Sequence, residues 1–278
     1  MIDFPNTDLA LEKYDFEELR GSEFIREEIN GFTVCTLDIS DMELSSNYKR
    51  EIGKYTSIFC PPLWQMDKLY IDMLSYTVAG VLERIIGTTI QNSIDDLSFL
   101  VVGLGNSDVS ADSLGPLTSK RLTVTRHLRK FLDCENAAAV STIIPGVLSQ
   151  TGIETLETVK GVVEKVAPDI VIAIDSLAAS ECESLGAVIQ VSNSGISPGS
   201  GIGNYRKGIN KETIGRPVIT LGIPTVVDVS TFFRNFSNGE KTSLPKSFFV
   251  SPKEIDRIAD IGAEVCSRAL DIVFGFYS

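Results

Sequence analysis

Three compact apolar runs, separated by segments of helical length, constrain the fold of this chain more than any other feature. The runs are residues 99–104, 170–174 and 218–223. Short runs of this kind are typical of parallel strands that are buried on both faces, and such strands need crossover segments between them. The sequence therefore predicts an α/β fold with a mostly parallel sheet flanked by helices.

Helices are predicted around these strands from apolar residues that recur at three- and four-residue steps. One helix is predicted over 70–86, and Gly87 is expected to end it. Others are predicted over 116–131, 154–166 and 252–273. The last begins with Ser251 as N-cap and Glu254 three residues later, which is the pattern of a capping box.

Two more strands are predicted, over 32–37 and 187–191. No linker divides the chain, so residues 7–278 are expected to form a single domain, with about 7–68 as a peripheral N-terminal region.

Composition and charge exclude several classes of function. The 278 residues carry a net charge of −12, which disfavours direct nucleic-acid binding. No apolar run is long enough for a membrane span, and no secretory signal is visible, so a cytoplasmic protein is expected. The five cysteines are scattered without a CxxC pair, and His127 is the only histidine. This excludes Ser/His and Cys/His mechanisms and multi-imidazole metal centres, and no metal site is predicted.

The turn after the first apolar run resembles a dinucleotide-binding turn but fails as one. Gly103 and Gly105 fit the pattern, whereas Asp108 stands in place of the third glycine and would face a pyrophosphate. No Gly-Lys-Ser/Thr follows, so a P-loop is excluded as well. No cofactor is therefore predicted.

Two aspartates follow separate apolar runs and are candidate catalytic residues. Asp112 lies between the run 99–104 and the next helix, and Asp175 follows the run 170–174. Carboxyl ends of parallel strands build the sites of open α/β sheets, so the two side chains are expected to converge. Two close carboxylates share a proton, which gives one base and one acid for peptide hydrolysis. The alternative for each is a helix cap or a turn.

Other polar positions are candidate neighbours of this site. Asn106, in the glycine turn, and Asp228, after the apolar run 218–227, are candidate substrate-binding residues, although Asp228 also suits a turn. The glycine-rich segment 195–208 is expected to be a loop. It either wraps a peptide or an anion or serves as a flexible connection.

The motifs in this order resemble the spore germination protease family. They are GLGN (103–106), DSLGP (112–116), VTRHL (124–128), PGV (145–147), TGIET (151–155), IAIDSLAA (172–179), PGSGIGN (198–204) and GIPTVVD (222–228). Weaker likeness is found over 7–10 and 251–256.

This resemblance implies an endopeptidase that hydrolyses small acid-soluble spore proteins during germination, in the forespore or spore core. It implies an atypical aspartic mechanism whose two aspartates match Asp112 and Asp175. It also implies a fold similar to that of hydrogenase-maturation endopeptidases (phosphorylase/hydrolase-like), with an N-terminal elaboration. Finally, it implies a homotetramer and a zymogen, whose short propeptide would be residues 1–6, cleaved between Asn6 and Thr7.

Two alternatives remain open. The first is a non-catalytic relative that binds spore proteins or an assembly partner, because the N-terminal region departs from the family pattern. The second is a metal-assisted peptidase, because the similar hydrogenase-maturation fold engages nickel, although a single histidine disfavours it.

Overall fold

The computed structural model describes residues 7–12, 23–128, 138–197, 207–229 and 248–276. The strands are β1 (Phe24–Ile29), β2 (Phe32–Ile39), β3 (Gly53–Phe59), β4 (Ser98–Gly103), β5 (Ala139–Ile143), β6 (Ile170–Ala179), β7 (Val188–Ser192), β8 (Val218–Asp228) and β9 (Phe249–Val250). The helices are α1 (Met42–Tyr48), α2 (Lys68–Thr89), α3 (Leu114–Arg121), α4 (Leu148–Thr151), α5 (Thr155–Val166), α6 (Lys211–Ile214) and α8 (Ile255–Val273). Short 3₁₀ turns are η2 (Leu63–Gln65), η3 (Ile94–Asp96), η4 (Ser110–Asp112) and η5 (Cys182–Ser184).

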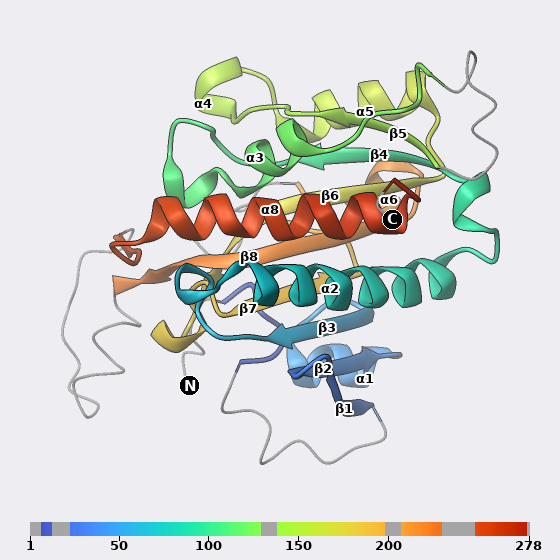
Figure 1. Cartoon of the computed structure of the whole chain (residues 1–278). Coiled ribbons are helices and arrows are strands. Elements are labelled where there is room, and N and C mark those ends of the chain that lie inside the picture. Colours follow the sequence, from blue (N-terminus) through green and yellow to red (C-terminus); the bar gives the residue numbers. More distant parts are fainter. Residues whose placement is uncertain (1–6, 13–22, 129–137, 198–206, 230–247, 277–278) are drawn as a thin grey trace.

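The described strands form one mixed sheet with helices packed against it (Figure 1). Their order is β1-β2-β3-β7-β8-β6-β4-β5, and the short β9 pairs with the end of β8. β5, β4, β6 and β8 are parallel to their neighbours, whereas β7 joins β8 antiparallel and β3, β2 and β1 continue antiparallel from it. The predicted α/β class is confirmed, and the parallel arrangement holds for the four strands β8, β6, β4 and β5 that form one end of the sheet.

Alternate residues of β6 enter two different cores. Ile172 and Ile174 lie in the cluster beneath α2 and α8, whereas Val171 and Ala173 lie in the cluster beneath α5. A strand that is buried on both faces needs apolar residues at every position. This is why the central strands read as continuous apolar runs.

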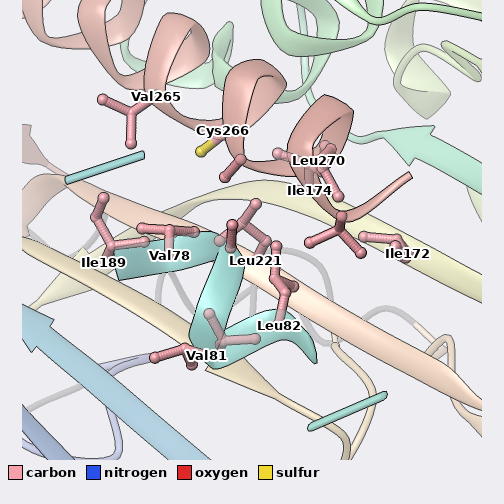
Figure 2. Close-up of a cluster of buried hydrophobic side chains, with 14 of the residues drawn as sticks. Val78, Val81, Leu82, Ile172, Ile174, Ile189, Leu221, Val265, Cys266 and Leu270 are labelled. Atoms are coloured by element: carbon pink, nitrogen blue, oxygen red, sulfur yellow. The ribbon is translucent and has the colours of Figure 1, made fainter. Parts of the chain in front are cut away.

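The larger core lies between the sheet and the long helices α2 and α8, which run side by side (Figure 1). Figure 2 shows Val78 and Leu82 of α2 and Leu270 of α8 pointing toward Leu221 of the sheet. Each such side chain contributes about 1.5–3 kcal/mol when it is fully buried. This layer therefore fixes the sheet on which the candidate site is built.

The opposite face of the sheet is covered by α5, by α1 and by residues 7–12, here called the N-terminal loop. Leu9 packs with Leu177 of β6, and Leu11 packs with Leu37 of β2. The buried carboxylate of Glu12 anchors the loop to the end of β6 and the turn that follows it. The expected propeptide, residues 1–6, lies outside the described residues.

The helix predicted over 116–131 is wrong over 122–128, because α3 ends at Arg121, and residues 129–131 lie outside the described residues. The chain instead joins the edge of β5: Thr125 N and Arg126 N both donate to Val140 O, at 3.0 and 2.9 Å. His127 accordingly lies in an exposed turn rather than on a helix. Tertiary hydrogen bonds outweigh helical periodicity here.

The ends of two other helices also differ from the prediction. α2 continues through Gly87 to Thr89. Gly87 does not adopt the left-handed conformation with which a glycine usually ends a helix. The capping box at Ser251 does not form: α8 begins at Ile255, and its N-cap makes no side-chain hydrogen bond. Pairing of β9 with β8 keeps the chain extended up to Val250, which delays the helix.

The predicted peripheral N-terminal region contributes strands to the same sheet, since β3 pairs with β7 over Tyr55–Ser192 to Phe59–Val188. Among the helices in the described parts of the chain, none is long and apolar enough to cross a bilayer.

Candidate active site

The turn after β4 fixes the position of Asp112. Gly105 has φ +105°, and a Cβ there would lie 2.1 Å from the carbonyl oxygen of Asp112 and 2.8 Å from its Oδ1. Asn106 N donates to the same carbonyl oxygen at 2.9 Å. Only glycine permits this close approach, so the position of Asp112 depends on Gly105 and the turn that it forms.

Gly115, at the start of α3, lies against the backbone of both strands that carry the site. A Cβ on Gly115 would lie 2.3 Å from Leu104 O and 2.5 Å from Ile174 O. Leu104 N donates to Ile174 O at 2.8 Å. Asp112 precedes Gly115 by three residues, and Asp175 follows Ile174 directly, so both aspartates lie at the carboxyl end of β4.

Asp175 lies within β6 rather than after it, because β6 stays paired with β8 up to Ala179. The prediction that Asp175 ends its strand is therefore wrong. β4, however, ends at Gly103, whose partner is Ile174, so Asp175 is the first residue of β6 beyond β4. Its side chain is 6% exposed, and its Oδ1 accepts a hydrogen bond from Ser176 N at 2.9 Å, which fixes the carboxylate.

Asp112 is not the N-cap of α3, so the helix-cap alternative for this residue is wrong. The structure assigns the N-cap of α3 to Ser113, whose hydroxyl bonds Ser110 O instead of capping the helix. Asp112 itself ends η4, the short turn that crosses the end of the sheet. Thr225 of β8 holds this turn by donating to Ala111 O at 2.7 Å.

Asn106 is held in the same turn by a residue that sequence reasoning missed. Gln150 of α4 donates from Nε2 to Asn106 Oδ1 at 2.6 Å and to Asp108 Oδ2 at 3.2 Å. Asp108 N also donates to Asn106 Oδ1 at 2.9 Å. Gln150 carries no sequence signal, since it lies on a four-residue helix without periodicity.

Asp228 lies far from Asp175 along the sheet. Asp175 pairs with Gly222, and Asp228 follows six residues later at the end of β8, opposite Phe249. At the usual rise of a strand this is roughly 20 Å. The structure brings Asn106 to the turn that holds Asp112, but it does not bring Asp228 to Asp175.

A cavity of about 550 Å³ lies on the face of the sheet opposite α2 and α8, and Asp175 is not one of the residues that line it. It reaches Leu177, two residues along β6, and Gly222, the partner of Asp175 on β8. Gly195 and Ile196, at the start of the predicted glycine-rich loop, also line it. Ile196 pairs with Ile209, which closes the base of this loop, while residues 198–206 lie outside the described residues.

Within the described residues, no three side chains of His, Cys, Asp or Glu gather where they could hold a metal ion. His127 is exposed and distant in sequence from every other candidate residue. The described residues around Asp112 and Asp175 offer carboxylates, amides and hydroxyls, as in Asn106, Gln150 and Thr225.

Comparison with known proteins identifies the family. A family model described as germination protease matches residues 6–237. Germination proteases of Clostridium perfringens and Caldanaerobacter subterraneus are 35% and 38% identical over 96% of this chain, and over 94% and 93% of their own lengths. That of Priestia megaterium is 40% identical over 80% of this chain and 63% of its own length.

A [NiFe] hydrogenase maturation protease from Thermococcus kodakarensis shares 15% identity at a TM-score of 0.34, covering 65% of this chain and 99% of its own. This likeness is too distant to bear on the site. The family model covers most of the chain, and the curated relatives align with nearly all of it. The chain therefore belongs to the germination protease family and is a peptidase.

Proposed function

We propose that the chain is an endopeptidase that hydrolyses small acid-soluble spore proteins during germination, in the cytoplasm of the spore core. The names of its relatives support germination as the setting. The observation that carries the proposal is the contact of Gly115 with both Leu104 and Ile174, because it ties the turn of Asp112 to the strand of Asp175.

The proposed mechanism divides acid and base between the two aspartates. The ionised carboxylate takes a proton from water as the oxygen attacks the peptide carbonyl, and the protonated one donates to the leaving nitrogen. Ser176 N, which donates to Asp175 Oδ1, favours Asp175 as the ionised member. Asp112 then acts as the acid, and Asn106 orients the substrate beside it.

The test is a set of Asp→Asn variants assayed on a purified small acid-soluble spore protein. Asp112→Asn and Asp175→Asn are expected to lose about 10²–10⁴-fold in kcat, as is usual for a general acid or base. Asp260→Asn, which removes a carboxylate from the surface pair with Arg121, is the matched control and keeps full activity. Full activity of the double variant would contradict the mechanism.

Two assays separate this proposal from its alternatives. A non-catalytic relative would bind the spore protein without cleaving it. A metal-assisted peptidase would lose activity after exhaustive dialysis against EDTA, whereas the two-aspartate mechanism predicts an unchanged kcat.

We further propose that the chain is made as a zymogen that is cleaved between Asn6 and Thr7, and that it forms a homotetramer. Arg50 supports the junction: its guanidinium holds the carbonyls of Thr7 and Leu9 at 2.8 and 2.7 Å, so a chain that begins at Thr7 keeps its anchored loop. Mass spectrometry of the active form is expected to find Thr7 as the new N-terminus. Sedimentation equilibrium is expected to give four times the chain mass.

A further inference from the structure

β1 forms one edge of the sheet, and in the described parts of the chain no strand pairs with its outer side (Figure 1). An edge strand presents a row of N–H and C=O groups to any other extended chain, and proteins usually protect it with proline, lysine or a β-bulge. β1 (FIREEI) contains neither proline nor lysine, and its register with β2 is unbroken from Phe24 to Ile29. The outer side of β1 is therefore open to a further strand.

The side chains of β1 alternate between two faces of the sheet. Glu27 forms an ion pair with Arg84 of α2, so the odd-numbered residues of β1 lie on the face that α2 covers. The even-numbered residues lie on the opposite face, where Arg26 Nη2 stands 4.0 Å from Glu28 Oε1. This face of the edge thus carries one positive and one negative charge side by side.

The geometry of an antiparallel ladder limits how β1 can pair with its own copy. Along one edge of a strand, the N–H and C=O groups of every second residue point outward. Two residues that face each other across the ladder must both point toward the partner strand or both point away from it. The axis of a two-fold pair therefore lies level with a residue and never midway between two residues.

Three positions of this axis give a poor match. An axis at Arg26 or at Glu28 would place that residue opposite its own copy, and like charges that face each other across a ladder are destabilising. An axis at Ile25 would pair only the first residues of the strand and would place Phe24 opposite Arg26. These registers oppose pairing.

An axis at Glu27 pairs β1 with its copy along most of the strand. Arg26 of each copy then faces Glu28 of the other, so four charges alternate in sign on this face, and opposite charges in such pairs are stabilising. Glu27 meets its own copy on the other face, where the ion pair with Arg84 in each chain balances its charge. In this register β1 is complementary to itself.

The same register brings apolar side chains together. It places Ile25, which is 58% exposed, opposite Ile29 of the second copy, and Ile29 is partly buried against the core beneath α2. Tyr76, which is 51% exposed, lies near this end of β1, because its neighbour Thr77 accepts a hydrogen bond from Asn30 Nδ2 in the β1–β2 turn. Pairing would therefore remove apolar surface from water at both ends of the ladder.

We infer that β1 pairs antiparallel with β1 of a second copy of this chain, about a two-fold axis at Glu27, so that two sheets join into one. A two-fold contact uses the same patch on both chains and is therefore closed. In a homotetramer, two such pairs would associate through another surface. The inference goes beyond the proposed peptidase function, because this pairing requires no hydrolysis.

The test exchanges the two charges and measures association by sedimentation equilibrium. Arg26→Glu and Glu28→Arg each create two like-charge contacts per pair, and each is expected to raise the dissociation constant of the pair at least about tenfold. In an equimolar mixture of the two variants, every contact between positions 26 and 28 again joins opposite charges. The mixture is expected to regain the wild-type mass.

Lys160→Glu and Glu157→Arg are the matched controls for these variants. They make the same changes in charge on the exposed face of α5 and are expected to keep the wild-type mass. A wild-type protein with the mass of one chain would overturn the inference. So would wild-type mass in both single variants, or a loss of association that the mixture does not reverse.

A disulfide test measures the register without relying on charge. Glu27→Cys places two thiols on the axis, where Cβ atoms of facing residues are about 4.5–5.5 Å apart, close to disulfide range. Ile25→Cys is the control, because its own copy lies four residues away along the ladder, roughly 13 Å. Oxidation followed by peptide mass spectrometry is expected to find two chains joined at position 27 and none joined at position 25. No link at position 27, or equal yields at both positions, would overturn the inference.

An activity assay separates this inference from the proposed function. Hydrolysis of a spore protein by a wild-type chain whose association is unchanged by Arg26→Glu and Glu28→Arg would remove the inference and keep the proposed function. A wild-type chain that pairs through β1 in both tests but hydrolyses nothing would do the reverse.

Discussion

A side chain on Gly105 would collide with Asp112, because its Cβ would lie 2.1 Å from the aspartate carbonyl oxygen and 2.8 Å from Oδ1. The glycine also has φ +105°, which L side chains rarely adopt. A shift of the turn would therefore move the aspartate, and a shift of the aspartate would move the turn.

Gly105→Ala is accordingly expected to reduce kcat by at least about 10²-fold, since a displacement near 1 Å of a reacting group has that effect. The matched control is Gly215→Ala, at φ +70° with nothing within 4 Å of the added Cβ. It carries backbone strain without a collision and is expected to keep its kcat. Equal kcat values for the two variants on a spore protein would show that Asp112 is not positioned by this turn.

The buried carboxylate of Glu12 accepts five hydrogen bonds. Oε1 accepts from Thr7 Oγ1 at 2.6 Å and from Ser180 N and Oγ at 2.7 Å, and Oε2 accepts from Glu181 N at 2.9 Å and Ser184 Oγ at 3.3 Å. Glu12→Gln turns an NH₂ group toward these donors. It is expected to lower the free energy of unfolding by about 1.5–3 kcal/mol, the range for hydrogen bonds to charged groups.

Urea titration with Glu157→Gln as control tests this prediction for Glu12. Glu157 lies on the exposed face of α5, and its replacement is expected to change the free energy of unfolding by less than about 0.5 kcal/mol. If both variants unfold at the same urea concentration, the N-terminal loop does not depend on Glu12.

The central strands could be predicted from the sequence because their signal is local. A parallel strand that is buried on both faces can be recognised in the sequence by consecutive apolar residues, as in β6. The antiparallel pairing of β3 with β7 joins residues more than a hundred positions apart, for instance Tyr55 and Ser192, and no local pattern encodes it. The contact of Thr125 with the edge of β5 could not be predicted from a local pattern for the same reason.

The sequence singles out the two candidate aspartates because each follows an apolar run, which is a positional signal. Gln150 and Glu12 were missed because polar residues on short segments have no periodicity, and their importance comes from partners far along the chain. The hydrogen bond between Ser192 and Thr220 belongs to this second kind: each residue looks like an ordinary strand position until the register of β7 and β8 brings the two together.

Cys60 and Cys266 are expected to resist alkylation in the native protein. Burial raises the pKa of each thiol to about 12, so the reactive thiolate is scarce at pH 8. Iodoacetamide labelling followed by peptide mass spectrometry is expected to find both unmodified in buffer and both modified in 6 M guanidinium chloride. Rapid native labelling of Cys266 would show that α8 separates from the sheet.

The last prediction concerns the pH dependence of stability. Asp271 on α8 accepts hydrogen bonds from Thr123 N and Oγ1, both at 3.1 Å. Burial raises the pKa of this carboxyl above its usual value, and the two bonds from Thr123 oppose the shift only in part. A raised pKa means that the folded chain favours the protonated form, so ionisation of Asp271 destabilises the fold.

Asp271 therefore contributes most to stability below its unfolded pKa of 3.8, and this contribution is lost as the pH rises through the folded value. Asp271→Asn keeps an acceptor for Thr123 without a charge. It is expected to raise Tm at pH 7 and to leave Tm unchanged near pH 3, where the wild-type carboxyl is protonated in both states. Asp256→Asn, at the exposed first turn of α8, is the control and lacks this crossover. A lower Tm of Asp271→Asn at pH 7 would mean that the charged hydrogen bonds to Thr123 outweigh desolvation.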